Sequence, residues 1–356
     1  MDKKTVAVLF GGVSSEHDVS LLSVTSVLRH LSRDRYDVIM IGITGDGRWL
    51  RFCGDIEQIA DGSWESHPDN RTAFFSPDHS TRGLIVRQDD GFALQKVDVV
   101  FPVLHGKNGE DGTLQGLLQL SGIPFVGCDL LSSAACMDKS VTNTLLEAAG
   151  VPQAEFLWLY SRDYDKRKDE IRREIDSRLG GYPVFVKPAN AGSSVGVSKV
   201  HCEAELDDAI QKAAHEDSRI VIEEGILGQE VECAVLGNEE PKASIVGEIA
   251  SSADFYDYED KYINGTSQLF LPARIPEETA EEIRRTAVYA YRSLGCGGLA
   301  RVDFFVRKSD GKIFLNELNT MPGFTNISMY PKLWEKTGLP YGELLDALID
   351  LAFARK

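Results

Sequence analysis

Two short apolar segments near the carboxyl end of the chain, separated by a turn signal, restrict the fold more than any other feature. Residues 300–305 and 314–319 are rich in Val, Phe and Leu, and Ser309-Asp310-Gly311 lies between them. Aromatic and β-branched runs on either side of Asp-Gly are typical of two antiparallel strands joined by a tight turn. The sequence therefore predicts a β-hairpin here, and its register decides which polar side chains can meet.

The turn length sets this register. Side chains alternate between the two faces of a strand, so Glu317 and Asn319 point the same way. A two-residue turn would place Asp303 on the opposite face. A three-residue loop, with Gly311 in the left-handed conformation as a bulge, pairs residue 303 with 317 and residue 301 with 319. We predict the three-residue loop, which brings Arg301, Asp303, Glu317 and Asn319 onto one face.

This face offers three oxygen-bearing side chains, Asp303, Glu317 and Asn319, without any His or Cys. Such a set is typical of a hard divalent cation, and Mg²⁺ suits it best. The alternative is a polar sheet face with one salt bridge to Arg301. Pro322-Gly323 follows closely and predicts a sharp turn with exposed backbone N–H groups, which favours stabilisation of an oxyanion beside a metal.

Composition excludes several classes of protein. The chain has 356 residues, enough for two or three domains, and its formal charge of −17 argues against general nucleic-acid binding. Any anionic substrate must therefore be bound by local Lys, Arg or N–H groups. The six cysteines are scattered without a Cys-x-x-Cys pair, as in free thiols of a reducing compartment. No apolar run approaches a membrane span or a signal-peptide core, so we expect a cytoplasmic protein without a membrane partner.

Two glycine-rich segments in the first third of the chain indicate a ligand crevice. A buried-type strand ends at Gly11-Gly12 and is followed by a helical pattern near Glu16, which opens an α/β sheet. A later strand leads into the loop that begins at His105, at the carboxyl end of that strand. The alternatives are that Glu16 only favours the helix dipole and that His105 is structural.

The middle of the chain contains features suited to a nucleotide. A strand that ends in Lys187-Pro188 is followed by the small-residue loop 189–194 and a second strand, which predicts a flap over phosphates or an ordinary hairpin. Glu223 ends another strand and Glu230 follows, where a carboxylate could bind adenine or ribose or simply be solvated. The mixed aromatic and charged stretch 254–262 predicts either a lid or a surface loop.

Arg301-Val302-Asp303 followed by Asn316-Glu317-Leu318-Asn319-Thr320-Met321-Pro322-Gly323 resembles the metal-binding segment of ATP-grasp ligases, and most of all that of the D-alanine–D-alanine ligase family. The resemblance spans essentially the whole chain, in the family's order. The other segments that resemble the family are Phe10-Gly11-Gly12 with Ser15-Glu16, His105-Gly106 with Gly109-Glu110-Asp111-Gly112, Met137-Asp138-Lys139, Val186-Lys187-Pro188, Gly192-Ser193-Ser194-Val195-Gly196, Glu223 with Glu230, and the ω-loop stretch 256–262.

The resemblance implies an α/β protein with the ATP-grasp fold. A Rossmann-like N-terminal α/β substrate-binding domain would span residues 1–127, a small central ATP-grasp subdomain residues 128–222, and a C-terminal α+β metal-binding domain residues 223–356. An ω-loop is expected near residues 253–268. The resemblance also implies a homodimer formed through the first domain.

The implied reaction joins two D-alanines for peptidoglycan precursor synthesis. ATP phosphorylates the carboxylate of one D-alanine, and the amine of the second attacks the acyl phosphate through a tetrahedral intermediate that releases phosphate. Two Mg²⁺ ions are expected, with Mn²⁺ as a substitute, and a monovalent cation is a further candidate. The implied metal ligands are Asp303, Glu317 and Asn319, and the implied ATP ligands are Lys139, Lys187, Ser194, Glu223, Glu230 and Lys261.

The remaining implied roles concern the amino-acid substrates. Glu16 would bind the first ammonium group within a network that includes Ser193 and Tyr262, while Arg301 and the Gly323 N–H would stabilise the oxyanion. Ser328, with Lys261, would orient the second carboxylate or the transferring phosphate. The implied catalytic residues are thus Glu16, Ser193, Tyr262, Arg301, Gly323 and Ser328, and the substrate-binding residues are Glu16, His105, Arg301, Gly323 and Ser328.

Three alternative functions remain. Ligases that join D-alanine to D-lactate differ in the ω-loop, whereas Lys261 and Tyr262 here resemble the dipeptide-forming group. A D-alanine–D-serine ligase is the other acceptor alternative. A non-catalytic nucleotide-binding regulatory module would be expected to have lost a metal ligand or Arg301, and all of these residues are present.

Overall fold

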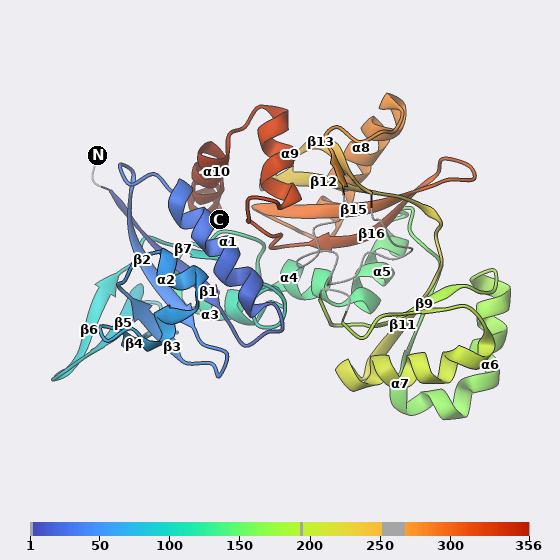
Figure 1. Ribbon diagram of the computed structural model, residues 1–356, viewed down its shortest axis with the longest axis horizontal. Coiled ribbons are helices and arrows are strands. Elements are labelled where there is room, and N and C mark those ends of the chain that lie inside the picture. The colour runs from blue at the N-terminus through green and yellow to red at the C-terminus, as the bar shows by residue number, and fades with distance from the viewer. Residues whose placement is uncertain (1–2, 193–194, 251–267, 356) are drawn as a thin grey trace.

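The computed structural model describes residues 3–192, 195–250 and 268–355, and these fold into three β-sheets with helices packed against them (Figure 1). The first sheet has seven strands in the order β6-β5-β4-β3-β2-β1-β7. Its strands are β1 Lys4–Gly11, β2 Tyr36–Ile43, β3 Trp49–Phe52, β4 Arg71–Phe75, β5 Gly83–Gln88, β6 Gly91–Lys96 and β7 Val99–Pro102. Only β2, β1 and β7 are parallel, while β3 to β6 form an antiparallel extension, so the Rossmann-like character is confined to one end of the sheet.

The second and third sheets are antiparallel throughout their described strands. The second has the order β10-β9-β11-β8, with β8 Phe156–Tyr160, β9 Val184–Pro188, β10 Ser198–Val200 and β11 Arg219–Glu224. The third has the order β14-β13-β12-β15-β16, with β12 Gly228–Leu236, β13 Lys242–Ala250, β14 Gln268–Phe270, β15 Leu299–Arg307 and β16 Ile313–Asn319.

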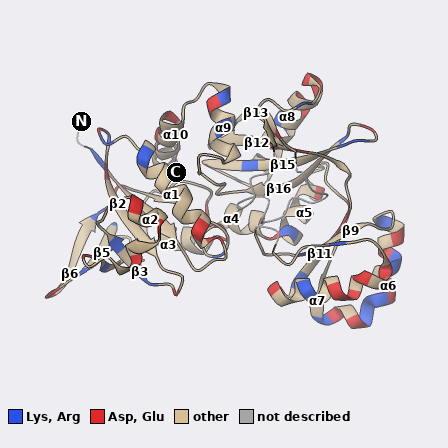
Figure 2. Cartoon of the chain, in the orientation of Figure 1, with Lys and Arg blue, Asp and Glu red and all other residues tan. Residues whose placement is uncertain are grey.

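The helices of the described residues cover these sheets, and none of them is long and apolar enough to cross a membrane. They are α1 His17–His30, α2 Glu57–Ala60, α3 Thr113–Ser121, α4 Leu130–Met137, α5 Lys139–Ala148, α6 Tyr164–Arg178, α7 Leu206–Glu216, α8 Glu277–Ser293, α9 Met329–Thr337 and α10 Tyr341–Ala354. Helices α6 and α7 pack on the second sheet, and lysines, arginines and carboxylates are interspersed along α6 (Figure 2). Many of these charges are paired, such as Arg167 with Glu170, so α6 is a mixed-charge surface.

The first and third sheets share one hydrophobic core. This core joins Phe10 and Phe101 of the first sheet to Phe324 and Trp334 in the last part of the chain. Helix α10 contacts both α1 and β7, so the carboxyl end of the chain packs beside its beginning (Figure 1). The second sheet has a core of its own, which includes Ile222. The domain limits at residues 127 and 222 remain predictions.

The predicted hairpin is β15 with β16, and its register is the expected one where the polar residues lie. Asp303 pairs with Glu317, and Arg301 pairs with Asn319. The turn differs from the prediction, because residues 308–311 form a four-residue loop closed by the Arg307–Lys312 pair. Gly311 is left-handed with φ 71°, as expected. A bulge at residue 316 then restores the predicted register between residues 303 and 317.

Candidate active site

A cavity of about 510 Å³ lies between the second and third sheets. Strands β9 and β11 supply one wall, β16 supplies the opposite wall, and the loops after β1 and β7 reach its end. The predicted site residues that line it are Glu16, Lys139, Lys187, Glu223, Glu230, Glu317 and Asn319. His105, Arg301, Asp303, Gly323 and Ser328 lie outside its lining. Ser193, Ser194, Lys261, Tyr262 and the ω-loop lie outside the described residues.

The β15–β16 wall gathers the polar side chains as the hairpin register requires. Arg301 donates from Nε and Nη2 to the two oxygens of Asp303, at 2.8 and 2.7 Å. Asn319 Nδ2 donates to Asp303 Oδ2 at 3.0 Å. Glu232, on the neighbouring strand β12, lies with Oε2 3.0 Å from Arg301 Nε. The predicted polar face therefore exists, with one additional carboxylate that the hairpin sequence could not indicate.

Among the described residues, this face has three carboxylates, Asp303, Glu232 and Glu317, around Arg301. Burial alone would lower the pKa of Arg301, but Asp303 and Glu232 outweigh it and, with Glu317, hold that pKa well above its usual value. Arg301 therefore stays charged, and it pairs with both Asp303 and Glu232. Carboxylate and amide oxygens gathered on one face are suited to a bound cation.

The donor set fits a divalent cation that takes part of its coordination from a substrate. Two carboxylates and an amide oxygen are hard ligands, which Mg²⁺ uses together with phosphate oxygens. Among the described residues, no three His, Cys, Asp or Glu side chains are arranged to hold a metal by themselves. The metal assignment for Asp303, Glu317 and Asn319 thus remains a prediction supported by charge and donor type.

The turn after β16 presents a free backbone donor. The Gly323 N–H makes no hydrogen bond within the described parts of the chain. A Cβ on Gly323 would lie 2.7 Å from Ser328 Oγ, so the Ser328 hydroxyl packs directly against this glycine. That hydroxyl accepts from the Thr325 N–H at 3.0 Å, which fixes its position beside the turn. Gly323 and Ser328 are thus neighbours, as their predicted roles require.

The β9–β11 wall has a different electrostatic character. Lys187 Nζ lies 2.5 Å from Glu223 Oε2, and both side chains are largely buried. Asn143 Nδ2, from α5, donates to the other oxygen of Glu223 at 3.0 Å. Lys187 and Glu223 were expected to contact different parts of ATP, and here they are paired with each other. An ammonium has three donors, so Lys187 can retain this bond and still offer N–H groups to a phosphate.

The phosphate-flap loop is anchored from α5. Lys139 Nζ donates to the Ala191 carbonyl at 2.8 Å, and the Lys139 N–H donates to the Ala189 carbonyl at 2.8 Å. A Cβ on Gly192 would lie 2.6 Å from Glu16 Oε2. The Glu16 carboxylate therefore lies against the flap, directly before the position of Ser193.

A buried acid and imidazole lie at the same end of the cavity. Glu110 accepts from the Gly106 N–H at 2.9 Å, and its carboxylate is 3.9 Å from His105 Nδ1. Burial, followed by the charge of Glu16, raises the pKa of Glu110 to about 8. Burial also lowers the pKa of His105. His105 is directed away from the cavity lining, toward Met321 and Ser23.

Sequence reasoning did not single out several residues that the structure places at the site. They are Asn143, which orients Glu223; Glu110 and Lys199, which line the cavity; Glu232, which pairs with Arg301; and Ser23, which contacts His105. Glu110 belongs to a quoted motif and could have been found there. The contacts of the others depend on pairings between distant segments.

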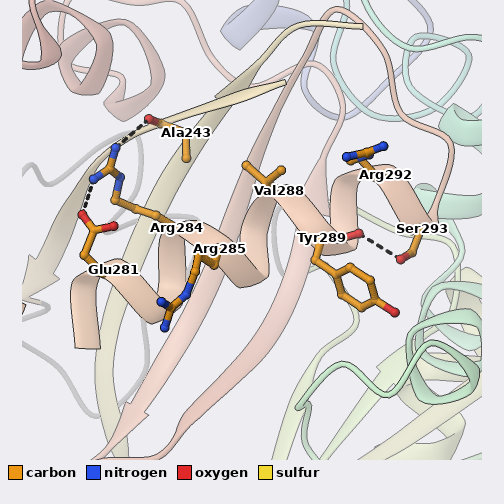
Figure 3. A pocket seen from close by; sticks show the side chains of 8 residues that line it. All are labelled: Ala243, Glu281, Arg284, Arg285, Val288, Tyr289, Arg292 and Ser293. Atoms are coloured by element: carbon orange, nitrogen blue, oxygen red, sulfur yellow. Dashed lines mark hydrogen bonds and ion pairs between the residues drawn. The ribbon is translucent and has the colours of Figure 1, made fainter. Parts of the chain in front are cut away.

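A second depression, on the outer face of α8, contains none of the predicted site residues (Figure 3). It is lined by Arg284, Arg285 and Arg292 together with Ala243, Glu281, Val288, Tyr289 and Ser293. Arg284 is paired with Glu281, as Figure 3 shows. The depression is therefore separate from the cavity between the two sheets.

Solved structures define the class of protein. The chain is similar to the VanG D-Ala:D-Ser ligase from Enterococcus faecalis, with a TM-score of 0.90 and 42% identity over 99% of this chain and 100% of that one. It is also similar to the D-alanine–D-alanine ligase from Coxiella burnetii, with a TM-score of 0.86 and 37% identity over 99% and 96%. Both matches cover essentially the whole chain, so this chain has the ATP-grasp fold of these ligases.

Sequence comparisons name the family. Residues 5–128 match the model described as D-ala D-ala ligase N-terminus, and residues 145–350 match D-ala D-ala ligase C-terminus. A D-alanine–D-alanine ligase from Acetivibrio thermocellus is 52% identical over 99% of this chain and 97% of its own. Another from Caldicellulosiruptor bescii is 50% identical over 100% and 96%. The chain belongs to the D-alanine–D-alanine ligase family, which confirms the predicted family and fold.

Proposed function

We propose that this chain is an ATP-dependent ligase that joins two D-alanines into D-alanyl-D-alanine for peptidoglycan precursor synthesis. The observation that supports this best is the β15–β16 face, where Arg301, Asp303, Glu317 and Asn319 lie in the register that the family motif requires. A module that had lost turnover would not be expected to retain the oxyanion arginine and all three oxygen donors.

The two sides of the cavity would have different roles: one would bind the ATP phosphates, and the other would bind the metal ion. Lys187 and Lys139 lie where ATP phosphates would enter, and each has donors to offer them. Transfer of a phosphoryl group depends on charge neutralisation and positioning more than on covalent catalysis. When bound to Asp303, Glu317 and Asn319, Mg²⁺ would neutralise charge on the transferring phosphate.

The amino-acid substrates would bind at the end of the cavity near Glu16. Its carboxylate offers an ion pair to the first ammonium group. Arg301 and the unpaired Gly323 N–H are the groups suited to an oxyanion on the tetrahedral intermediate, and Ser328 lies beside that N–H. The contributions of Ser193, Lys261 and Tyr262 remain proposals from the family motif, as do the homodimer, the cytoplasmic location and the monovalent cation.

The experiment that tests this function is phosphate release by purified protein with Mg²⁺-ATP and D-alanine, with chromatography of the product. We expect D-alanine-dependent release with one dipeptide formed per phosphate, and no release with L-alanine. Bound ATP without D-alanine-dependent release would instead favour the non-catalytic nucleotide-binding module.

D-serine is the second acceptor to test, because the chain is 42% identical to a D-Ala:D-Ser ligase over nearly its full length. Competition between equal concentrations of D-alanine and D-serine, with D-lactate in a parallel arm, would rank the three acceptors. We expect D-alanyl-D-alanine as the main product. If D-alanyl-D-serine or D-alanyl-D-lactate were the main product, the preferred acceptor would change, but the protein would still be a ligase of this class.

A further inference from the structure

The turn that contains Gly323 is held at both ends by buried groups from the first sheet and its helix. His105 Nδ1 lies 3.0 Å from the Met321 carbonyl, directly before Pro322-Gly323. The Phe324 N–H, directly after them, donates to Ser23 Oγ at 3.3 Å. Ser23 Oγ is also 3.1 Å from His105 Nε2, which closes the network. Ser23, Met321 and Phe324 are at most 3% exposed and His105 is 4% exposed, so water does not compete for these bonds.

The protons of this network can be assigned by counting donors and acceptors. The Met321 carbonyl only accepts, so His105 Nδ1 must have the proton. In the neutral imidazole, Nε2 is then an acceptor, and the Ser23 hydroxyl donates to it. The same hydroxyl oxygen accepts from the Phe324 N–H. Every donor has one acceptor, and burial supports the neutral ring because it lowers the pKa of His105.

The network matters because it anchors both ends of the turn, together with the Tyr341 hydroxyl, which donates to the Phe324 carbonyl at 2.7 Å. Pro322 has no N–H, and the Gly323 N–H makes no bond within the described residues. The direction of the Gly323 N–H is thus set by how Met321 and Phe324 are anchored.

We propose that Ser23 is a positioning residue for catalysis: through His105 and the Phe324 N–H, it fixes the turn that directs the Gly323 N–H at the reaction centre. This inference rests on the proposed function, in which that N–H stabilises the oxyanion. Ser23 lies on α1, far from residue 323 in sequence, and does not line the cavity. It acts on the rate of the chemical step without contacting either substrate.

The test compares Ser23→Ala with a matched control on the same helix, Ser26→Ala. Ser26 Oγ donates to Asn326 Oδ1 at 3.1 Å, so it reaches the same loop but outside the turn from Met321 to Phe324. We expect Ser23→Ala to lower kcat about 10- to 100-fold, because a misplaced oxyanion donor loses much of its effect. The KM for ATP should stay within about twofold of the parent, since Ser23 lies outside the nucleotide cavity. Ser26→Ala should leave kcat and KM near the parent values.

Two further measurements separate positioning from general destabilisation. Ser23→Thr keeps the hydroxyl and should recover most of the lost kcat, whereas a purely structural role would make it no better than alanine. Nitrogen-15 NMR of the imidazole, assigned with a His105→Gln variant, should show the Nδ1-protonated tautomer in the parent. An Nε2-protonated ring would overturn the network.

The remaining outcomes are equally decisive. If the parent turns over D-alanine and Ser23→Ala has the same kcat as Ser26→Ala, the inference fails and the proposed function stands. If Ser23→Ala raises the KM for ATP in proportion to its loss of kcat, Ser23 has a general structural role and the inference fails. If the parent shows no D-alanine-dependent turnover, both the proposed function and this inference fail.

Discussion

The two walls of the cavity are both antiparallel strand pairs, but they treat charge differently. On β9 and β11, Lys187 and Glu223 pair one to one, with Asn143 as an additional donor. On β15 and β16, Arg301 is shared by Asp303 and Glu232, and Glu317 adds a third carboxylate. Among the described residues, the first wall pairs its cation and carboxylate one to one, whereas the second gathers several carboxylates around one arginine. The second wall is therefore the one whose donors suit a bound divalent cation.

The largest effect is expected from Glu317→Ala. Removal of a predicted metal ligand should lower D-alanine-dependent phosphate release by about 10³-fold or more. The variant should remain folded, because Arg301 keeps its pairing with Asp303 and Glu232. Asp310→Ala is the matched control on the same hairpin, since Asp310 pairs with Arg307 in the turn. Its activity should stay within about twofold of the parent. Loss of folding in Glu317→Ala, measured by thermal denaturation, would assign Glu317 a structural role instead.

On the β9–β11 wall, in contrast, removal of one charged side chain should destabilise the fold. Lys187→Met leaves Glu223 buried without its ion partner, so the free energy of unfolding should fall by about 3–5 kcal/mol. A double variant, Lys187→Met with Glu223→Gln, removes the leftover charge and should recover most of that loss. Calorimetric titration should show that both variants bind ATP at least about 10-fold more weakly than the parent does. Each variant lacks the Lys187 ammonium that would contact the phosphates.

Recovery of ATP affinity in the double variant would contradict this account of the β9–β11 wall. It would mean that Lys187 acts only as the partner of Glu223. Equal stability of the parent and the single variant would show that the ion pair contributes nothing to the fold.

A smaller effect is expected from Glu110, the largely buried acid at the end of the cavity. The pKa of Glu110 is raised to about 8, against 4.5 for an ordinary glutamate, so the folded protein retains a proton that the unfolded chain loses. Between these two values, stability should fall as pH rises, by up to about 1.4 kcal/mol per pH unit from this group. Urea denaturation at pH 5.5 and 7.5 should therefore show that Glu110→Gln gains stability over the parent at the higher pH.

The exposed Glu335→Gln variant is the control for this pH series and should track the parent. If the difference between Glu110→Gln and the parent is the same at both pH values, the Glu110 carboxyl does not titrate in this range. The rest of the account would then stand without a protonated acid at the end of the cavity.

The local sequence pattern was sufficient to predict which residues share a face of the β15–β16 hairpin, but it did not predict the length of the loop. Alternation along β16 correctly placed Glu317 and Asn319 together, because side-chain period is a property of the strand itself. The expected three-residue loop was wrong. The Leu315 N–H bonds to the Pro152 carbonyl, and Leu315 bridges to Gln153, where the bulge begins. A pairing between segments so far apart in sequence cannot be inferred from the turn residues.

The same limit applies to the site. Lys187 and Glu223 both line the cavity, and their predicted contacts with ATP stay predictions. Their pairing with each other depends on the β9–β11 register. His105 was expected at a substrate. Its bonds to Ser23 and Met321 arise where the first and third sheets share a core. The face on which a side chain lies within one strand was thus predictable, whereas contacts between segments distant in sequence were not.

The central claim is that the oxygen donors of the β15–β16 face bind a divalent cation, and a metal titration tests it most directly. Mn²⁺ can be titrated in the presence of ADP and followed by its electron paramagnetic resonance signal in the parent, Glu317→Ala and Asp310→Ala. We predict that the parent and Asp310→Ala bind Mn²⁺ alike and that Glu317→Ala loses at least about 10-fold in affinity. Equal Mn²⁺ affinity in the parent and Glu317→Ala would contradict the account, because the cation would then bind elsewhere.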